Sequence, residues 1–263
     1  MSLLLTIFIT GASSGIGRAL AQLYAKRGAA LGLVARRAGV LDELQAELLA
    51  LGARTVRCYA LDVADEQALD RAAQDYLAHV GVPDIVIANA GVSSGTLTGR
   101  SGDLAAIRRI FEINVFGMAH TFAPFVASMR QAAANGRHVR LVGIASVAGI
   151  RGLPGAEAYS ASKAAVIAYL ESLRVELRAA NVRVVTIVPG YVATPMTAIN
   201  PYAMPFLLPV DRAAERFATA IALGRGYSVI PWQMGLVAKV LRLLPNWLYD
   251  RLFANAPQKP RVL

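Results

Sequence analysis

The amino-acid sequence predicts an α/β fold in which a doubly wound parallel sheet of about seven strands carries helices on both faces. Short apolar runs rich in β-branched residues alternate along the chain with Ala-, Leu- and Arg-rich segments of helical periodicity. The runs are apolar throughout, which indicates strands buried on both faces. Strict alternation of strand and helix predicts right-handed βαβ crossovers, so we expect a single Rossmann-like domain.

Each expected strand is a short apolar run, and a helical pattern follows each of the first six. The runs span residues 3–9, 29–34, 56–61, 84–88, 138–145, 182–188 and 227–230. The helical patterns span residues 15–27, 39–51, 65–80, 103–134, 157–180 and 211–223. No linker, repeat or low-complexity segment divides the chain, so we expect one domain in residues 1–230, with residues 231–263 as its C-terminal amphipathic extension.

The composition excludes several kinds of site. The 263 residues are 56% hydrophobic and 17% charged, and no segment has a disordered composition. A single cysteine, Cys58, excludes an intrachain disulfide framework and a Cys-rich zinc site, and it fits a reducing compartment. The histidines at positions 79, 120 and 138 lie far apart without paired acids, so we expect no metal site.

The net charge of +10 favours acidic partners such as nucleic acid, anionic lipid or phosphorylated small molecules. Because the basic residues are spread along the chain without a run of five or more, we expect no nucleic-acid binding. The N-terminal apolar run lacks a basic region and ends in a glycine loop, which indicates a buried strand and not a signal peptide. No uninterrupted apolar stretch approaches the ~18–20 residues that span a bilayer.

The segment TGASSGIG, residues 10–17, stands between the first strand and the first helix, which is the position of a phosphate-binding loop. Gly11 permits the tight turn, Gly15 lets the backbone approach a pyrophosphate, and Gly17 lets the helix pack on the sheet. The two serine hydroxyls can donate to phosphate oxygens, so a dinucleotide site is favoured over a glycine turn without a ligand. The candidate cofactor-binding residues of this loop are Gly11, Ser13, Ser14, Gly15, Ile16 and Gly17.

The end of the second run, LVARRAG, bears on the choice between NADP and NAD. Ala35 stands where an NAD-preferring site has an acid that bonds the adenosine ribose. Arg36 and Arg37 follow, and an arginine pair can hold a 2′-phosphate through bidentate charge-assisted bonds. The alternative is two solvated arginines that lead into a helix. We expect a preference for NADP(H), with Arg36 the better candidate and NAD(H) the alternative cofactor.

Candidate cofactor contacts also follow the third and fourth runs. Asp62 can accept a hydrogen bond from an adenine amino group, or it can cap the helix that begins near Asp65. In the segment NAG, Gly91 permits a ribose to approach the backbone, and Asn89 can pin the loop to a neighbouring strand. The candidate cofactor-binding residues of these two segments are Asp62, Val63, Asn89, Ala90 and Gly91.

Four motifs then occur in one order along the chain. They are TGASSGIG, NAG, a serine thirteen residues before a Tyr-x-x-x-Lys, and PGYVATPM. With these motifs the sequence resembles the short-chain dehydrogenase/reductase family over about residues 3–230. The resemblance implies a dinucleotide-binding and catalytic domain in residues 1–230, and hydride transfer between a nicotinamide cofactor and an alcohol or carbonyl compound.

The resemblance also implies roles for individual residues. Tyr159 would be the general acid in reduction and the general base in oxidation, and Ser146 would hydrogen-bond the substrate oxygen. Lys163 would bind the nicotinamide ribose, and Asn114 would hold a water that links Lys163 to solvent. In PGYVATPM, the implied contacts of the nicotinamide end are Pro189, Gly190 and Thr194.

The spacing of Tyr159 and Lys163 has a chemical reason. Four residues make about one helical turn, so both side chains leave from the same face. A free tyrosine has a pKa near 10, and a cation about 4–6 Å away favours the phenolate. We therefore expect Lys163 to lower the pKa of Tyr159. A Tyr/Lys pair at this spacing is usually surface decoration when it stands alone, and the catalytic interpretation depends on the company of Ser146 and Asn114.

The C-terminal extension has a broad apolar face with a basic component from Lys239, Arg242 and Arg251. The apolar residues are Trp232, Leu236, Val237, Val240, Leu241, Leu244, Trp247, Leu248 and Leu252. Such a segment can close on its own core or lie at a lipid interface through residues 232–253. It can also cover the substrate cleft or pack in a subunit interface. The sequence leaves these alternatives open.

Residues 191–210 are rich in Pro, Met and Phe and almost uncharged, which favours a hydrophobic substrate pocket. We expect an NADP(H)-dependent oxidoreductase that acts on a bulky apolar carbonyl or alcohol, lipid-like or steroid-like. The alternative is a sensor or scaffold that binds NADP(H) without turnover. We expect a cytoplasmic homodimer or homotetramer, with peripheral membrane contact as an open alternative.

Overall fold

The computed structural model describes residues 5–263 and forms one seven-stranded sheet, so the first two residues of the first expected strand lie outside the described residues. The strand order is β3-β2-β1-β4-β5-β6-β7, and every neighbouring pair is parallel. The strands are β1 Thr6–Thr10, β2 Ala30–Ala35, β3 Thr55–Ala60, β4 Ile85–Ala88, β5 Arg140–Ile144, β6 Arg183–Pro189 and β7 Tyr227–Ile230. The predicted doubly wound sheet is confirmed, and the order reverses between β1 and β4, the point where such sheets bind ligands.

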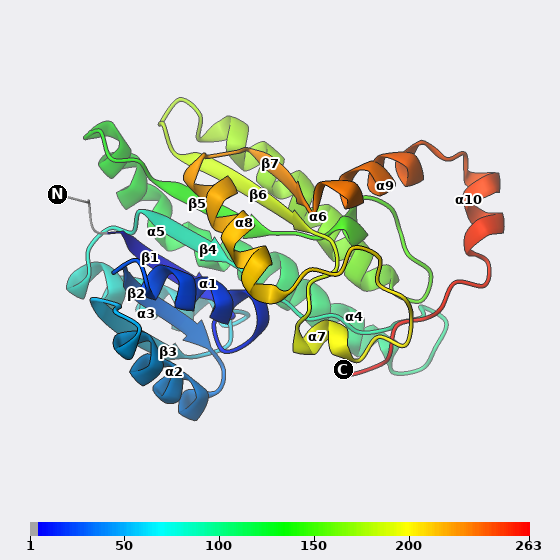
Figure 1. The fold of residues 1–263 in the computed structure, drawn as a ribbon, viewed down its shortest axis with the longest axis horizontal. Helices are drawn as coiled ribbons and strands as arrows, with labels where there is room; N and C mark the ends of the chain where they lie inside the picture. The colour runs from blue at the N-terminus through cyan, green and yellow to red at the C-terminus, as the bar shows by residue number, and fades with distance from the viewer. Residues whose placement is uncertain (1–4) are drawn as a thin grey trace.

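Helices cover both faces of the sheet (Figure 1). One face packs against α1 Gly15–Ala25, α2 Ala38–Ala50 and α8 Val210–Ala222. The other packs against α3 Glu66–His79, α5 Gly117–Ala134 and α6 Glu157–Glu176. On this second face the ring centroids of Phe8 and Phe125 lie 4.9 Å apart, and the Tyr76 ring meets Phe8 edge-on at 5.3 Å. These rings fill the space between β1, α3 and α5, which fixes the helices against the strands.

The single helix expected over residues 103–134 is interrupted. It consists of α4 Asp103–Phe111, a π-helical turn Glu112–Phe116, and α5. By length and composition this stretch is apolar enough to cross a membrane, because an 18-residue window within it has a mean hydropathy of 1.3. Phe122, Phe125 and Met129 are nevertheless fully buried against the sheet, as in the core helix of a globular domain.

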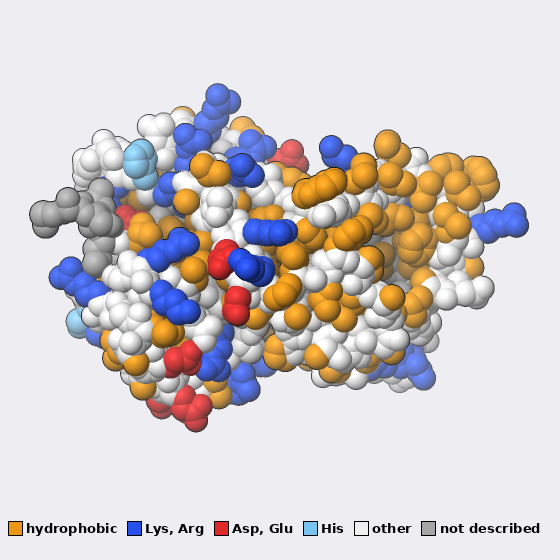
Figure 2. Space-filling view, viewed as in Figure 1, with side chains coloured by type: hydrophobic (Ala, Val, Ile, Leu, Met, Phe, Trp, Pro, Cys, Tyr) orange, Lys and Arg blue, Asp and Glu red, His pale blue; other side chains and the backbone are white. Residues whose placement is uncertain are grey.

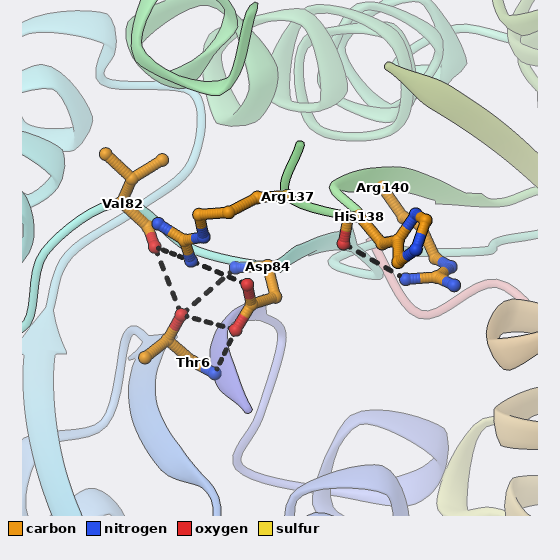
Figure 3. Close-up of polar contacts among 6 residues, drawn as sticks. All are labelled: Thr6, Val82, Asp84, Arg137, His138 and Arg140. Carbon is orange, nitrogen blue, oxygen red and sulfur yellow. Dashed lines mark hydrogen bonds and ion pairs between the residues drawn. The ribbon is translucent and has the colours of Figure 1, made fainter. Parts of the chain in front are cut away.

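Polar contacts tie together the amino edge of the sheet, opposite the expected site (Figure 3). The Asp84 carboxylate accepts from the Thr6 backbone N–H and hydroxyl, both at 2.9 Å, and pairs with Arg137 at 2.6 Å. Arg137 also donates to the Val82 carbonyl at 2.9 Å. Nearby, Arg140 donates to the His138 carbonyl at 3.2 Å. The starts of β1 and β4 are thus fixed to the turn before β5, which leaves the carboxyl edge for ligands.

Two helices follow β7, namely α9 Trp232–Leu243 and α10 Asn246–Phe253. From these helices only Met234, Ala238 and Tyr249 are buried. Trp232 and Trp247 are 70% and 69% exposed, and apolar side chains gather over this part of the surface (Figure 2). The alternative in which the extension closes on its own core is therefore wrong for most of the expected apolar face, because each helix contacts the domain through a narrow side only.

Candidate active site

The glycine loop and the segment after β4 meet at the reversal point of the sheet. Ser14 is extended and occupies the N-cap position of α1, where its side chain makes no capping hydrogen bond. Gly11 has a φ of +70°, and a Cβ there would lie 2.7 Å from the Ala90 Cα. A Cβ on Gly17 would lie 2.3 Å from the Gly11 carbonyl oxygen. Both positions therefore require glycine, and the loop leaves the N-terminus of α1 open to an anion.

Asn89 holds this junction together. Its side-chain amide donates to the carbonyl oxygens of Thr10 and Gly11 at 3.0 and 3.1 Å. Its backbone N–H donates to the Thr10 hydroxyl at 3.2 Å. The expected pin between the fourth run and a neighbouring strand is confirmed, and Asn89 joins β4 to β1.

The arginine pair stands at the N-terminus of α2. Arg36 and Arg37 are both exposed, and Arg37 donates to the Ser13 hydroxyl at 3.3 Å. The first turn of α2 contains no acidic residue. The two arginines and Ser13 therefore line the cavity beside Ala35 at the positive end of the α2 dipole, an arrangement suited to a phosphate group.

Asp62 is not the cap of α3, so that alternative is wrong. Asp65 caps the helix, accepting from the Ala68 N–H at 2.9 Å. Asp62 instead accepts from the Ala64 N–H at 3.0 Å and forms an ion pair with Arg109 of α4. Asp62 still lines the cavity described below, together with Val63, so its position fits the expected adenine contact.

Tyr159 and Lys163 lie in the first two turns of α6, and Lys163 is 4% exposed. The Lys163 Nζ donates to the Ile144 carbonyl at 2.9 Å and lies 6.0 Å from the centroid of the Tyr159 ring. Ser146 follows β5, where its hydroxyl caps a 3₁₀ turn, Val147–Gly149, at 3.2 Å from the Ala148 nitrogen. The end of β5 and the start of α6 thus bring the three side chains to one place.

The electrostatics of this group differ from the expectation. Burial raises the pKa of Tyr159 above its ordinary value, and a hydrogen bond with the Ser146 side chain acts in the opposite direction. Burial also lowers the pKa of Lys163 to about 8. The lowered phenol pKa expected from the Tyr–Lys spacing is wrong for this arrangement, because desolvation dominates and the ammonium is directed to the Ile144 carbonyl.

Asn114 lies within the π-helical turn and is fully buried. Its carbonyl oxygen accepts from the Val92 N–H at 2.8 Å, and its amide donates to the Val92 carbonyl and the Ser162 hydroxyl, both at 3.0 Å. A Cβ on Gly91 would lie 3.2 Å from the Asn114 oxygen and 3.5 Å from the Lys163 Nζ. Asn114 therefore joins the segment after β4 to α6 beside Lys163, and the water-holding role stays a prediction.

The segment after β6 forms the side of the cleft that faces the glycine loop. Pro189 ends the strand, and the Gly190 N–H donates to the Ile230 carbonyl at 2.9 Å. Thr194 precedes the short helix α7 Pro195–Ala198, and a Cβ on Gly15 would lie 3.3 Å from its methyl group. The expected nicotinamide contacts thus face the glycine loop across the cleft.

These elements enclose a cavity of about 310 Å³ at the carboxyl edge of the sheet. Of the predicted catalytic and cofactor-binding residues, all but Gly17 and Asn114 line it, and those two support the loops from behind. Within residues 5–263, no three His, Cys, Asp or Glu side chains gather as a metal site would require.

The family follows from a comparison with known proteins. A family model described as short chain dehydrogenase matches residues 5–202. The chain belongs to the short-chain dehydrogenase/reductase family of oxidoreductases. The resemblance drawn from the four motifs is therefore confirmed at the level of the family.

Two relatives and one solved structure illustrate the range of this family. An oxidoreductase of Myxococcus xanthus is 39% identical over 245 residues, covering 93% of this chain and 94% of that protein. The 11-beta-hydroxysteroid dehydrogenase-like 2 of Arabidopsis thaliana is 31% identical over 258 residues, which cover 95% of this chain and 82% of that protein. The structure of a short chain dehydrogenase/reductase from Burkholderia phymatum in complex with NAD gives a TM-score of 0.80 at 25% identity. The match covers 99% of this chain and 98% of that chain.

One residue beside Tyr159 was missed by sequence reasoning. The Nζ of Lys259, near the end of the chain, lies 4.9 Å from the centroid of the Tyr159 ring, closer than that of Lys163. No motif marks Lys259, and no periodicity in residues 254–263 predicts where they pack.

Proposed function

We propose that the chain is an NADP(H)-dependent oxidoreductase that interconverts a hydrophobic carbonyl compound and its alcohol by hydride transfer. The observation that carries this proposal is that Tyr159, Ser146 and Lys163 line the same cavity as the glycine loop. A nicotinamide cofactor, when bound, supplies the hydride. The NAD complex of the Burkholderia phymatum relative supports a nicotinamide cofactor.

The preference for NADP(H) over NAD(H) is supported by the N-terminus of α2. An NAD-specific site places an acid at the end of the second strand to bond the ribose 2′-hydroxyl. Here Ala35 ends β2, and Arg36 and Arg37 line the cavity with Ser13. These groups would bind a 2′-phosphate through charge-assisted hydrogen bonds, while a 2′-hydroxyl would leave both guanidinium groups without an anion.

Proton transfer falls to Tyr159. In reduction its hydroxyl donates to the carbonyl oxygen as negative charge builds there, while the Ser146 hydroxyl hydrogen-bonds the same oxygen. Because burial raises the pKa of Tyr159, the phenol keeps its proton at neutral pH. We therefore expect reduction to be the efficient direction near pH 7, and oxidation of the alcohol to become faster as the pH rises.

Lys163 acts beside the reacting atoms. With a pKa of about 8, it is an ammonium at neutral pH. One of its three protons is engaged by the Ile144 carbonyl, and the others are free to bond the hydroxyls of a nicotinamide ribose. Asn114 keeps Gly91 and α6 in place around this ammonium.

An apolar substrate is supported by the segment between β6 and α8. Val192 and Met196 line the cavity, and Phe206 and Leu207 are 50% and 42% exposed nearby in the chain. Residues 191–210 contain no acidic and no basic residue, so the segment has no group that would pair with a charged substrate. The 31% identity to a hydroxysteroid dehydrogenase-like protein supports a bulky apolar compound.

The decisive experiment removes the hydroxyl group of Tyr159. Tyr159→Phe should reduce NADPH-dependent reduction of a ketone by about 10³-fold, with little change in the dissociation constant of NADPH. Turnover is followed as NADPH consumption with 2-ketones of graded length, from acetone to 2-dodecanone, and long ketones should be preferred. Persistent turnover in Tyr159→Phe would show that another group supplies the proton.

The same experiment tests the alternative of a sensor or scaffold. Such a protein would bind NADPH without consuming it with any ketone or aldehyde in the screen. The grouping of Tyr159, Ser146 and Lys163 at one cavity argues against it, because a binding module has no need of a buried phenol next to a lysine.

A second proposal concerns the exposed face of α9 and α10, which we assign to contact with an anionic lipid surface. Apolar Trp232, Leu236 and Trp247 are 60–70% exposed on these helices, which also carry Lys239, Arg242 and Arg251. Tryptophans with basic neighbours on one amphipathic segment are typical of interfacial helices. This contact would make a cytoplasmic protein membrane-peripheral.

Vesicle co-sedimentation tests this assignment. The full chain should sediment with phosphatidylglycerol vesicles and not with phosphatidylcholine vesicles, and Trp232→Ser with Trp247→Ser should abolish the effect. Val175→Ser, which removes a 63% exposed apolar side chain from α6, is the control. If the double variant instead converts a homodimer or homotetramer to monomers in analytical ultracentrifugation, the face is a subunit interface and the lipid assignment is wrong.

A further inference from the structure

The last residues of the chain lie across the segment that follows β4. The Gly95 N–H donates to the Pro260 carbonyl at 2.8 Å, and the Val262 N–H donates to the Ser94 hydroxyl at 3.0 Å. Arg261 forms an ion pair with Asp103 at 2.9 Å, and the Asp103 side chain is only 12% exposed. We name residues 258–262 the strap. Backbone and side-chain contacts both fix it at the start of α4.

Two glycines permit this close packing. A Cβ on Gly95 would lie 2.0 Å from the Lys259 carbonyl oxygen. Gly155, with a φ of +71°, would place a Cβ 2.8 Å from the Cγ of Gln258. A side chain at either position would displace the strap, so its path depends on residues that precede α4 and α6.

The strap brings a cation to the reacting group. The Lys259 Nζ lies 4.9 Å from the centroid of the Tyr159 ring, within the distance of a cation–π contact. Among residues 5–263, no carboxylate lies within ion-pair distance of Lys259. The ammonium therefore has the Tyr159 ring as its electrostatic partner.

We propose that Lys259 is a positioning residue for Tyr159, delivered by the strap, and that its charge fixes the ring and favours the phenolate during proton transfer. The proposal rests on the proposed function, because it assigns Tyr159 the proton transfer. The cation comes from a part of the chain outside the four motifs, whereas the Lys163 ammonium is directed to the Ile144 carbonyl.

Three titratable groups surround Tyr159. Lys163 approaches from α6, Lys259 from the strap, and Tyr202 from the segment after α7. Burial, together with Tyr191 and Tyr159, raises the pKa of Tyr202 to about 12, so Tyr202 stays neutral over the working range. Burial lowers the pKa of Lys259 to about 8. Below that pH both lysines carry charge beside the phenol, and above it the field of Lys259 is lost.

The first test is a pH profile. Oxidation of 2-octanol by NADP⁺ requires the phenolate, so kcat/KM rises with pH through the pKa of Tyr159. Below pH 8, where Lys259 is charged, Lys259→Met should lower kcat/KM about tenfold, because a cation within about 4–6 Å favours the phenolate by one to a few pKa units. Above pH 8 the two profiles should converge, because the Lys259 side chain is then neutral. Lys259→Arg should restore most of the profile, and Lys26→Met, an exposed lysine of the α1 terminus, should leave it unchanged. A profile of Lys259→Met identical to that of the unmodified enzyme would overturn the proposal.

The second test does not require turnover. Phenolate absorbance at 295 nm is titrated in the full chain and in Tyr159→Phe, and the difference isolates Tyr159. The same pair of titrations is repeated with Lys259→Arg, whose guanidinium keeps its charge at the pH where the phenol titrates. We expect the isolated midpoint to fall by about one unit. An unshifted midpoint refutes the role of Lys259, whether or not 2-octanol is a substrate.

The third test examines the strap itself by hydrogen exchange. Gly95→Ala should expose residues 258–262 to hydrogen exchange and reproduce the loss of kcat/KM that Lys259→Met causes below pH 8. Gly99→Ala should do neither, because a Cβ at Gly99 meets nothing within 4 Å. A strap that exchanges freely in the unmodified chain refutes the proposal while leaving the proposed function intact. Turnover by Tyr159→Phe would refute the proposed function while leaving the docking of the strap intact.

Discussion

The loops that follow β1 and β4 and the helices α9 and α10 both lie at the carboxyl edge of the sheet, but they are held there differently. Asn89 and Asn114 connect the loops through buried or half-buried hydrogen bonds to neighbouring elements. In the helices, Leu243 and Trp247 are 83% and 69% exposed. The helices are held by a few buried side chains and by Arg151, which donates to the carbonyls of Leu241 and Leu244 at 2.7 Å.

This difference separates two kinds of specificity. The glycines and asparagines of the loops are determined by backbone geometry, because no other residue would fit the close approach of the two segments. The helices present side chains to the surface. Contacts with a partner, and not contacts within the chain, would therefore determine which residues are favourable there. Two of the four family motifs accordingly fall in the first region, and none falls in the second.

The largest expected effect is on stability and tests the buried side of the comparison. Burial lowers the pKa of Lys163 from 10.5 to about 8, so between these pH values the unfolded chain binds a proton that the folded chain does not. Stability therefore rises with pH over this window, by about 3 kcal/mol in total. Urea unfolding of the unmodified chain and Lys163→Met from pH 7 to 10 measures it, since other groups cancel in the difference. Parallel curves would show that Lys163 is not desolvated.

The next effect concerns the cofactor. Arg36→Asp removes one charge-assisted contact and places a carboxylate next to the expected 2′-phosphate. We expect the ratio of NADPH to NADH affinity to fall roughly 10- to 100-fold, measured by fluorescence titration. Arg71→Asp, which makes the same charge change on the exposed side of α3, is the control. Unchanged selectivity in Arg36→Asp would assign the phosphate to Arg37 and Ser13, or remove the preference for NADP(H).

The smallest effect is local and sharpens the comparison. Arg151→Ala removes the donor to the last turn of α9 and a guanidinium that lies 4.1 Å from the Tyr249 ring centroid. Amide exchange in α9 and α10 should accelerate roughly tenfold, while NADPH affinity stays the same. Arg178→Ala, at an exposed position after α6, is the control. Loss of NADPH affinity in Arg151→Ala would mean that the two regions are coupled.

Much of the fold and many of the candidate cofactor-binding residues could be predicted because their sequence signals are local. Seven apolar runs became seven strands, with ends displaced by three residues or fewer. Asn89 was expected to pin its loop because it directly follows a strand whose neighbours are fixed by the βαβ order. These inferences need only the chain near the residue and one rule of topology.

The contacts that were missed join distant segments. Asp62 pairs with Arg109, 47 residues away, and Asn114 bonds Val92, 22 residues away. The placement of Lys259 over Tyr159 depends on glycines 95 and 155, which have no motif of their own. The predicted direction of the Tyr159 pKa shift was wrong for a related reason. A spacing of four residues specifies a common helix face but not the degree of burial.

The π-helical turn at Glu112–Phe116 has a consequence for how this region tolerates insertions and deletions. A π turn accommodates one residue more than an α-helical turn, and each residue rotates a helix by about 100°. Deleting one residue there would give a smoother helix with the same composition, yet it would rotate α4 by about that angle against α5. Asp103 would then turn away from Arg261, and Arg109 from Asp62. Chain length in this turn is therefore constrained independently of residue identity, and an alignment or redesign that regularises the helix would remove contacts on both sides of the cleft.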